Sequence, residues 1–330
     1  MIIIINGPLG IGKTDVSWQL LPGFERGIML DGDYIGAVHP FEIYDEARVE
    51  YLYQTICHLV SFHKSHNYHN FIINYVFETP QSLARLRHLL ADLDDVIYAF
   101  RLYCDEFEHE QRVLSRKRKH ITWELTRFKE LTTIIEAASN QGDMGYPIDT
   151  TTLTIPQIAD LIWAHVKEAV DLAPYDPAWP QQYQTESQKI QTALADYLLE
   201  IHHIGSTAIP GLTAKPIIDI MLTVKNLEDV IECIASLKQL GYFFLDYPQN
   251  TDRRFFKKGF PRTHHLHIVE QNSQSLHDHL VFRDALRNNE TLCQEYAVIK
   301  TGLATRYKND RATYSANKTA FINKIVKTAV

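Results

Sequence analysis

The glycine-rich segment near the start of the chain limits the choice of fold more than any other feature. It reads Gly-Pro-Leu-Gly-Ile-Gly-Lys-Thr over residues 7–14 and fits G-x-x-x-x-G-K-[ST] at every fixed position. Ile2–Ile5 before it is a continuous β-branched run, which predicts a strand buried on both faces of a parallel sheet. A buried strand, a glycine loop and a helix that begins near Lys13 together predict an α/β layer.

Strand-like and helix-like segments alternate to about residue 170. They are inner strands at residues 71–77 and 96–103, and helices at residues 41–66 and 80–92. Thr154 and Gln157 match a capping box and predict a last helix that runs to about Val170. This alternation predicts a doubly wound α/β domain, with a parallel sheet and helices on both faces.

A change in amino-acid composition near residue 170 predicts a domain boundary. Pro174, Pro177 and Pro180 lie within seven positions and cannot continue a helix, so we predict domains at 1–170 and 171–330. The expected elements of the second domain are a helix at 181–199, strands at 200–204 and 216–224, strands near Phe255 and His265, and a helical tail from about Ser275. Together they indicate an α+β domain with a mixed or antiparallel sheet.

Composition narrows the environment and the partners. The 330 residues carry a formal net charge of -7, which argues against a nucleic-acid partner because phosphate backbones require clustered Lys and Arg. The four cysteines form no C-x-x-C pair, as expected in a reducing compartment. No apolar run approaches the ~20 residues that span a bilayer. We therefore expect a cytoplasmic protein with no membrane contact.

The glycine loop predicts a phosphate site, because its N–H groups and the following helix N-terminus can surround an anion. The candidate binding residues are Gly7, Gly10, Ile11, Gly12, Lys13 and Thr14. Lys13 would reach the β- and γ-phosphates, and the Thr14 hydroxyl would ligate Mg²⁺. The alternative is a chance glycine-rich turn, which the flanking strand and helix disfavour.

The chain has no N-K-x-D guanine motif, which disfavours a GTPase and favours a kinase. Asp31 and Asp33 lie at the expected end of the second strand, where their carboxylates can face the phosphates. Asp33 is the preferred base for a substrate hydroxyl, and Asp31 would assist the metal. Asp-Gly is also a common turn, which is the alternative interpretation of these residues.

A basic cluster follows the strand that ends near Cys104. Arg112, Arg116 and Arg118 lie on a helical segment and could form a mobile lid that neutralises a transferring phosphoryl group. A solvated basic face is the alternative. Only the cluster, and no single arginine, supports the lid.

Residues 1–170 thus resemble small P-loop kinases of the nucleoside, shikimate and chloramphenicol-phosphotransferase type. The resemblance rests on residues 7–14, 30–33, 112–118 and 148–151. It implies ATP, Mg²⁺ and phosphate transfer to a small-molecule hydroxyl. Kinases of this group often carry a D-T-[ST] step beside the adenine, which implies a nucleotide-binding role for Asp149 and Thr150. Asn74 departs from the pattern, because many relatives have a Walker-B aspartate there; Asp31, Asp33 or Glu78 could substitute.

The second half resembles the opening of a nucleotidyltransferase core. A strand, the Gly205-Ser206 turn and Asp219 on the next strand match that pattern, in which Gly-Ser holds a triphosphate and D-x-[DE] binds two metals. Met221 replaces the second carboxylate, which leaves half of a two-metal clamp.

A wider match identifies the second half as resembling the GrpB family, a nucleotidyltransferase-related group. The matching segments are residues 175–180, 205–219, 253–259 and 262–267, within a region from about 175 to 324. The family also occurs fused to P-loop kinases, notably dephospho-CoA kinase. The resemblance therefore adds dephospho-CoA kinase as a candidate activity of the first half.

Polar residues predict an anionic or nucleotide ligand in the second domain. The candidate site residues are Gly205, Ser206, Lys215, Asp219, His265 and His267. His265 and His267 share a strand face, with His264 and Glu270 on the other, and could ligate a metal with Asp219 or His203. The alternative is a polar strand whose histidines hydrogen-bond substrate or backbone.

The leading hypothesis is an ATP-dependent kinase acting on a small-molecule hydroxyl, with an accessory GrpB domain. A nucleotide-binding regulator or folding-accessory protein is the first alternative, favoured by Asn74 and Met221. Nucleotidyl transfer by the second domain is the other, and the missing carboxylate weakens it.

Overall fold

The computed structural model describes residues 1–39, 42, 45–94, 96–116, 121–166, 170–246, 251–259, 262–308 and 311–328. The chain divides into two units, Met1–Val166 and Lys167–Val330. This division lies four residues before the one expected from the proline-rich segment.

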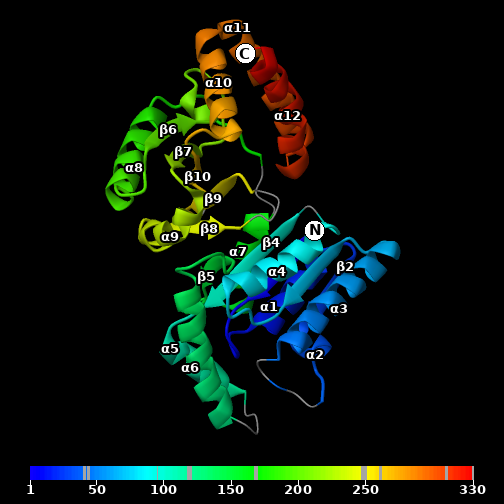
Figure 1. The fold of residues 1–330 in the computed structure, drawn as a ribbon. Helices are drawn as coiled ribbons and strands as arrows, with labels where there is room; N and C mark the ends of the chain where they lie inside the picture. The colour runs from blue at the N-terminus through cyan, green and yellow to red at the C-terminus, as the bar shows by residue number, and fades with distance from the viewer. Residues whose placement is uncertain are drawn as a thin grey trace. The chain divides into compact units, whose positions relative to one another are not determined.

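The first unit contains a parallel five-stranded sheet (Figure 1). In spatial order its strands are β2 (Gly27–Asp31), β3 (Asn70–Asn74), β1 (Ile2–Asn6), β4 (Ile97–Tyr103) and β5 (Tyr146–Asp149). Every neighbouring pair is parallel, and β1 lies at the centre with all five residues buried. The chain leaves β1 toward β2 and leaves β4 toward β5, so the crevice where ligands bind in such sheets lies at their carboxyl ends.

Helices cover both faces of this sheet (Figure 1). They are α1 (Lys13–Leu20), α2 (Gly32–Ile35), α3 (Glu46–Ser65), α4 (Pro80–Ala91), α5 (Glu106–Ser115), α6 (Ile121–Ala138) and α7 (Ile155–Val166). The buried side chains of α3 and α4 pack with Ile2 and Ile4 of β1. Helices α1 and α7 contact each other on the opposite face. The predicted α/β class with helices on both faces is therefore confirmed.

The observed elements differ from the expected ones mainly at their ends. The third strand ends at Asn74, because the chain turns away there and residues 75–79 lead into the Thr79 cap of α4. The last helix begins at Ile155, and the Thr154 and Gln157 side chains form the predicted reciprocal bonds. The residue pattern alone did not predict strand β5, since its four residues include Pro147 and only partly alternate, although the kinase resemblance implied a strand leading into the step at Asp149.

The second unit contains a mixed five-stranded sheet. Its spatial order is β6 (Glu200–Ile204), β7 (Ile218–Val224), β10 (His264–Glu270), β9 (Arg253–Lys258) and β8 (Tyr242–Leu245). Only β7 and β10 run parallel among the pairs of this sheet that the structure describes. This arrangement agrees with the expected α+β class and its mixed sheet.

Two groups of helices pack on this sheet. Helices α8 (Trp179–Ala193) and α9 (Val230–Gln239) bury their apolar sides in one core with β7 and β10. The expected helical tail is three helices, α10 (Gln274–Asn288), α11 (Glu290–Arg306) and α12 (Arg311–Thr328), which contact one another. Met221 and Leu276 lie in a core cluster between β7 and α10.

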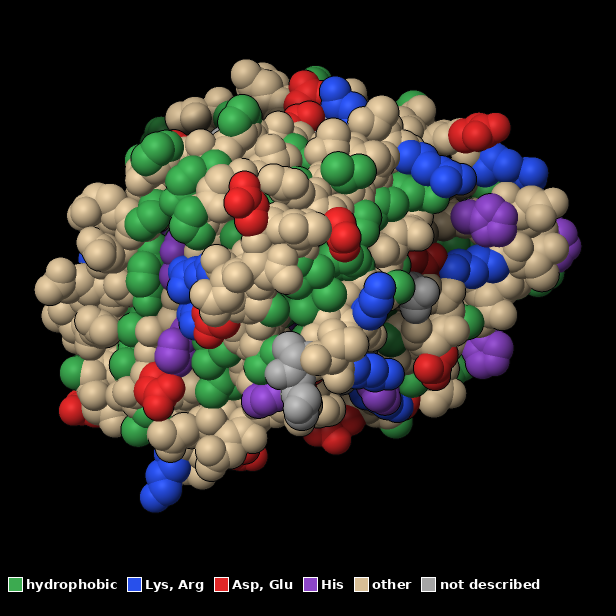
Figure 2. All heavy atoms as spheres, turned by 90° about the horizontal axis from the view of Figure 1, so that it is seen from above, with side chains coloured by type: hydrophobic (Ala, Val, Ile, Leu, Met, Phe, Trp, Pro, Cys, Tyr) green, Lys and Arg blue, Asp and Glu red, His purple; other side chains and the backbone are tan. Residues whose placement is uncertain are grey.

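Two features of the structure bear on membrane contact: the types of side chain on its surface and the length of its helices. On the face seen in Figure 2, acidic, basic and hydrophobic side chains are interspersed. Within the described residues, no helix is both long enough and apolar enough to span a membrane.

A buried ion pair ties α4 to the segment before β5 in the first unit. Arg87 of α4 donates to Asp143, and their side chains are 4% and 2% exposed. The other carboxylate oxygen of Asp143 accepts from the Gly145 backbone N–H at 2.7 Å. Breaking one partner of a buried pair is costly because the other charge stays desolvated.

We predict that Asp143→Ala lowers the free energy of unfolding of the first unit by about 3–5 kcal/mol. Amide exchange of the β1 core strand would measure this change. The matched control is Glu50→Ala, which removes an exposed pair with Arg85 (2.7 Å) and should cost about 0–1 kcal/mol. Equal losses in the two variants would contradict the prediction.

Candidate functional site

The loop between β1 and α1 is held in a conformation that only glycine adopts easily. Gly7, Gly10 and Gly12 have φ angles of 147°, 86° and 105°. A Cβ atom on Gly7 would lie 2.7 Å from the Leu102 carbonyl oxygen, and one on Gly10 would lie 2.7 Å from Val113 Cγ2. Side chains are therefore excluded both by backbone conformation and by space.

The loop curls around the buried ammonium group of Lys13. Lys13 Nζ donates to the carbonyl oxygens of Gly7 (3.0 Å) and Pro8 (3.2 Å), and the residue is 6% exposed. Burial lowers the pKa of Lys13 to about 8, against the opposing charges of Asp33 and Asp31. The group is thus a cation at neutral pH that backbone dipoles, rather than a bonded carboxylate, hold in place.

Asp31 at the end of β2 and Asp33 in α2 lie near this lysine in different environments. Asp31 is buried; its Oδ2 accepts from the Thr14 hydroxyl (3.0 Å), and its Oδ1 accepts from the Asp33 backbone N–H (3.0 Å). Asp33 has an exposed side chain, and partial desolvation raises the pKa of its carboxyl, while Lys13 opposes this effect. A raised pKa makes Asp33 a better proton acceptor than an ordinary aspartate.

Thr14 and Asp31 are the residues that could hold Mg²⁺. A hydroxyl and a carboxylate bonded to each other offer hard oxygen ligands, and Mg²⁺ usually completes its shell with water and substrate phosphates. Among the described residues, no group of three His, Cys, Asp or Glu side chains could hold a metal by itself. The expected site therefore fits a metal that arrives with phosphates, rather than a resident ion.

Of the residues considered for the Walker-B role, Asn74 and Glu78 have other partners. Asn74 is buried at the end of β3, in register with Asp31, and its amide donates to Ser17 Oγ of α1 at 3.3 Å. Glu78 pairs with Arg127 of α6 at 2.5 Å. Asp31 is the carboxylate bonded to Thr14, so it substitutes for the missing aspartate better than Glu78.

A histidine that the sequence did not single out fastens the loop to α5. His109 is 1% exposed, and its Nε2–H donates to the Leu9 carbonyl oxygen at 2.7 Å. Burial lowers the pKa of His109 to about 4, against the opposing effect of that backbone bond. It is therefore a neutral donor that positions the loop. A lone histidine on a helix carries no motif that could have predicted this contact.

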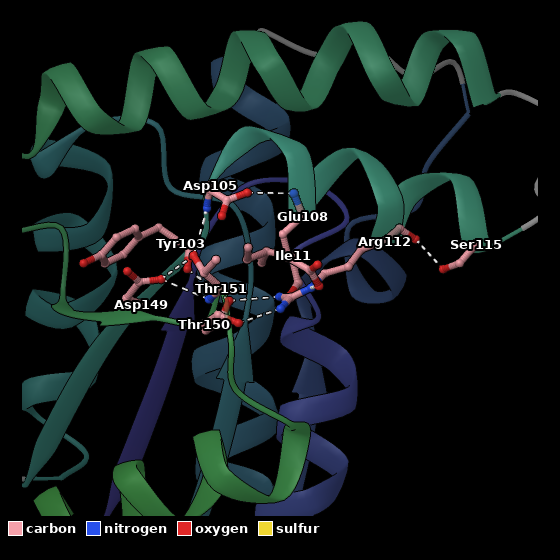
Figure 3. Close-up of polar contacts among 9 residues, drawn as sticks. All are labelled: Ile11, Tyr103, Asp105, Glu108, Arg112, Ser115, Asp149, Thr150 and Thr151. Atoms are coloured by element: carbon pink, nitrogen blue, oxygen red, sulfur yellow. Dashed lines mark hydrogen bonds and ion pairs between the residues drawn. The ribbon is translucent and has the colours of Figure 1, made fainter.

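Arg112, predicted to lie in a mobile lid, makes bonds that join α5 to neighbouring segments (Figure 3). Its guanidinium donates to the Thr150 hydroxyl (2.9 Å), the Thr150 carbonyl (2.6 Å) and the Ile11 carbonyl (3.4 Å). Its Nε pairs with Glu108 at 2.8 Å. These contacts make Arg112 a link between α5, the glycine loop and the segment after β5.

The structure describes Arg116, another arginine of the cluster, in less detail than Arg112, and it does not describe Arg118. Arg116 follows α5, is half-buried, and lies near enough to Lys13 to lower the pKa of that lysine. Arg118 lies outside the described residues.

The predicted nucleotide-binding step at Asp149 and Thr150 is a tightly bonded turn (Figure 3). Asp149 Oδ1 accepts from the backbone N–H (2.9 Å) and the hydroxyl (2.6 Å) of Thr151. Thr150 is fully buried and donates its hydroxyl to the Tyr103 carbonyl at 3.0 Å. Asp149 is exposed, so this residue, and not the Thr150 side chain, is open to a ligand.

The second unit brings four of its six predicted residues to one cavity of about 170 Å³. Its lining residues are Ser206, Lys215, Ile217, Asp219, His265, Lys300, Tyr314, Ser315 and Lys318. Gly205 lies against the same aspartate, because a Cβ atom there would meet Asp219 Oδ2 at 2.3 Å. His267 is not among the lining residues, and the sequence had not indicated Lys300 or Lys318.

Asp219 and His265 form a hydrogen-bonded pair. His265 Nδ1 donates to Asp219 Oδ1 at 2.9 Å. Burial raises the pKa of Asp219, but the His265 bond and the charges of His267 and Lys318 outweigh it and hold the pKa below its usual value. Asp219 therefore stays ionised in the folded protein.

The other candidate metal ligands of this unit are occupied or buried. The Thr207 hydroxyl donates to the Ile217 carbonyl, so it accepts from His203 Nε2, and that nitrogen is not a free ligand. Met221 is fully buried in a core cluster. The idea of a metal site on His265, His267 and Asp219 finds no support within the described residues.

Comparison with known proteins places the second unit. A family model described as GrpB protein matches residues 169–328. The UPF0157 protein PA4798 of Pseudomonas aeruginosa is 41% identical over 174 residues, which are 51% of this chain and 71% of that protein. The chain belongs to the GrpB protein family.

Two further comparisons concern kinases. A dephospho-CoA kinase of Mycolicibacterium paratuberculosis is 29% identical over 175 residues, which are 45% of this chain and 43% of that kinase. The structure of a shikimate kinase from Acinetobacter baumannii in complex with shikimate aligns at 20% identity and a TM-score of 0.34, covering 50% of this chain and 92% of that one. The parallel sheet and the glycine loop after its central strand give the first unit the α/β arrangement expected from the sequence.

We predict that His109 stays neutral, as the Nε2–H tautomer, to a pH near 4. Two-bond ¹H–¹⁵N correlation spectra of the imidazoles would show this, and His109→Gln would identify the signal. Because an unfolded histidine titrates near 6.5, the unfolded state binds more protons between pH 6.5 and 4, so His109 lowers stability as the pH falls through that window. A midpoint above 6 or an Nδ1–H tautomer would contradict the assignment.

Proposed function

We propose that the first unit is an ATP-dependent phosphotransferase that acts on the hydroxyl of a small molecule. One observation carries the proposal: the glycine loop curls around the buried Lys13 ammonium at the carboxyl end of the central strand, beside Thr14, Asp31 and Asp33. Such a loop presents backbone N–H groups and a cation to phosphate oxygens. The kinase resemblance of the fold agrees with it.

Each residue of the site has a role in this reaction. Lys13 binds the β- and γ-phosphate oxygens in place of the two carbonyls to which it now donates. Thr14 and Asp31 hold Mg²⁺, which neutralises charge on the phosphates when bound. Asp33 accepts the proton of the acceptor hydroxyl as that oxygen bonds to the γ-phosphorus and the bond to the β-phosphate breaks.

The acceptor side has features that go beyond the predicted residues. Arg48 of α3 is 9% exposed and lies near enough to Asp33 to oppose the rise in the pKa of that carboxyl. Tyr75, which follows β3, bonds to Arg48, and burial raises the pKa of this tyrosine. Asp33 is thus an exposed carboxylate with Arg48 and Tyr75 nearby, and these two side chains could orient a polar acceptor.

A regulator without chemistry and a nucleotidyltransferase are the alternatives. The buried thioether of Met221 opposes the second, since Mg²⁺ prefers oxygen ligands and two-metal transfer needs a second carboxylate. A regulator without chemistry would bind ATP but would yield no phosphorylated product.

Labelled ATP incubated with the full chain and a metabolite extract should transfer label to a discrete small molecule. We predict that Lys13→Ala lowers this transfer about 10²–10³-fold and weakens ATP binding, because the phosphate cation is lost. Lys129→Ala, at an exposed position on α6, is the matched control and should behave like the unaltered chain. Transfer that is absent from the unaltered chain, or equal in folded Lys13→Ala, would refute the proposal.

Asp33→Asn should lower kcat about 10²–10⁴-fold with the identified acceptor while ATP binding is largely kept. The base must be ionised, so the rate of the unaltered enzyme is present above the pKa of Asp33 and falls as the pH drops through it. That fall should occur at a higher pH than for an ordinary aspartate, and Asp33→Asn should remove it. Asp15→Asn, on the exposed side of α1, is the control. An unchanged kcat in Asp33→Asn would show that another group takes the proton.

A further inference from the structure

The cavity of the second unit gathers positive charge from three separate parts of the chain. Lys215 precedes β7, Lys300 lies on α11 and Lys318 lies on α12. Asp219 is the acidic residue among those that line the cavity, and it already accepts a bond from His265. With three ammonium groups facing one paired carboxylate, the cavity favours an anion and disfavours a divalent cation.

Lys300 is the most unusual member of this set. It is 2% exposed, and its Nζ donates to the Thr213 carbonyl oxygen at 2.6 Å. Within the described part of the chain, no carboxylate forms an ion pair with it. A buried ammonium with one neutral acceptor is costly to stability, so its retention points to a use for the charge.

Two tyrosine rings support the three lysines without neutralising them. The Lys300 ammonium lies 5.5 Å from the centre of the Tyr296 ring. The ammonium groups of Lys215 and Lys318 lie 5.6 Å and 4.3 Å from the centre of the Tyr314 ring. A cation–π contact stabilises an ammonium but leaves its net charge in place. The Tyr296 ring therefore leaves the charge of the protonated Lys300 available to a ligand.

We propose that this cavity binds a phosphoryl group, held by the ammonium groups of Lys215, Lys300 and Lys318. Its volume of about 170 Å³ is well above the ~10–15 Å³ that one water needs, so a compact polyanion fits. Ser206, another lining residue, adds a hydroxyl. The proposal is independent of ATP use by the first unit, because every residue in it belongs to the second.

The ligand is a phosphate ester or a polyphosphate, free or as part of a nucleotide. Three point-like ammonium groups suit the several oxygens of a phosphoryl group better than a planar carboxylate, which arginine would bind in a bidentate manner. The site thus acts by binding, since its Asp219 is paired with His265 and Met221 provides no second carboxylate.

Anion binding should draw a proton onto Lys300. In the free protein, desolvation and the charges of Lys318 and Lys215 lower the pKa of Lys300 to about 7, while Asp219 and Cys293 oppose the shift. These charged groups come from the segment before β7, from β7 itself, from α12 and from α11. A bound anion favours the charged form, so this pKa rises and protons are taken up between pH 7 and 8.

Titration calorimetry with pyrophosphate can test both statements. The full chain would carry Lys13→Ala, so that the glycine loop contributes little, and two buffers of different ionisation enthalpy at pH 7.5 would count the protons. Pyrophosphate should bind with net proton uptake. Adding Lys300→Met should weaken binding at least tenfold and abolish the uptake, whereas Lys225→Met, an exposed lysine in the turn after β7, should change neither.

Parallel titrations with inorganic phosphate and with ATP identify the source of the phosphoryl group. Competition by ATP assigns the site to nucleotides, and binding of phosphate without ATP assigns it to compact phosphates. Lys300→Met should also raise the melting temperature of the second unit, because an apolar side chain of similar length replaces a desolvated charge. Lys318→Met provides a second variant.

Three results would overturn the proposal. The first is no binding of pyrophosphate, phosphate or ATP to the Lys13→Ala chain. The second is binding that Lys300→Met and Lys318→Met leave unchanged. The third is equal weakening by the Lys225→Met control, which would show a diffuse charge effect rather than a site.

Discussion

A buried ammonium group that donates to backbone carbonyls is the interaction around which both units are arranged. In the first unit, Lys13 donates to Gly7 and Pro8, and its pKa falls to about 8. In the second, Lys300 donates to Thr213, and its pKa falls to about 7. Neutral acceptors hold these charges without cancelling them, which keeps each lysine ready for an anion at the cost of some stability.

The surroundings of Lys13 show how much structure is needed to maintain such a charge. The positive φ angles of its glycines set the conformation of the loop. His109 donates a hydrogen bond to the Leu9 carbonyl of the loop, and Arg112 bonds to both Ile11 and Thr150. These contacts come from α5 and from the segment after β5, which lie about a hundred residues or more beyond the loop. The helix expected to act as a lid therefore also braces the loop that it would cover.

The two buried lysines differ in how far the sequence alone predicts their roles. Lys13 belongs to a local motif of eight residues, so its role was predictable from spacing alone. Lys300 and Lys318 lie in helices far from the Gly205-Ser206 turn, with no motif around them. The predicted residues Ser206, Lys215, Asp219 and His265 do line the cavity, but Lys300 and Lys318 were not among the predicted residues.

By itself, the sequence determined the elements that depend on neighbouring residues: the strand at Ile2–Ile5, the glycine loop, the Thr154 cap and the three-proline break. The resemblances to P-loop kinases and to the GrpB family were also visible in the sequence, because each matching motif is a continuous segment. Only the tertiary structure decided that Arg112 anchors the loop, that Asn74 bonds to Ser17, that His203 is engaged with Thr207, and that three distant lysines share one cavity. Local propensities act over a few residues, whereas these contacts join segments that only folding brings together, so their partners cannot be inferred from spacing.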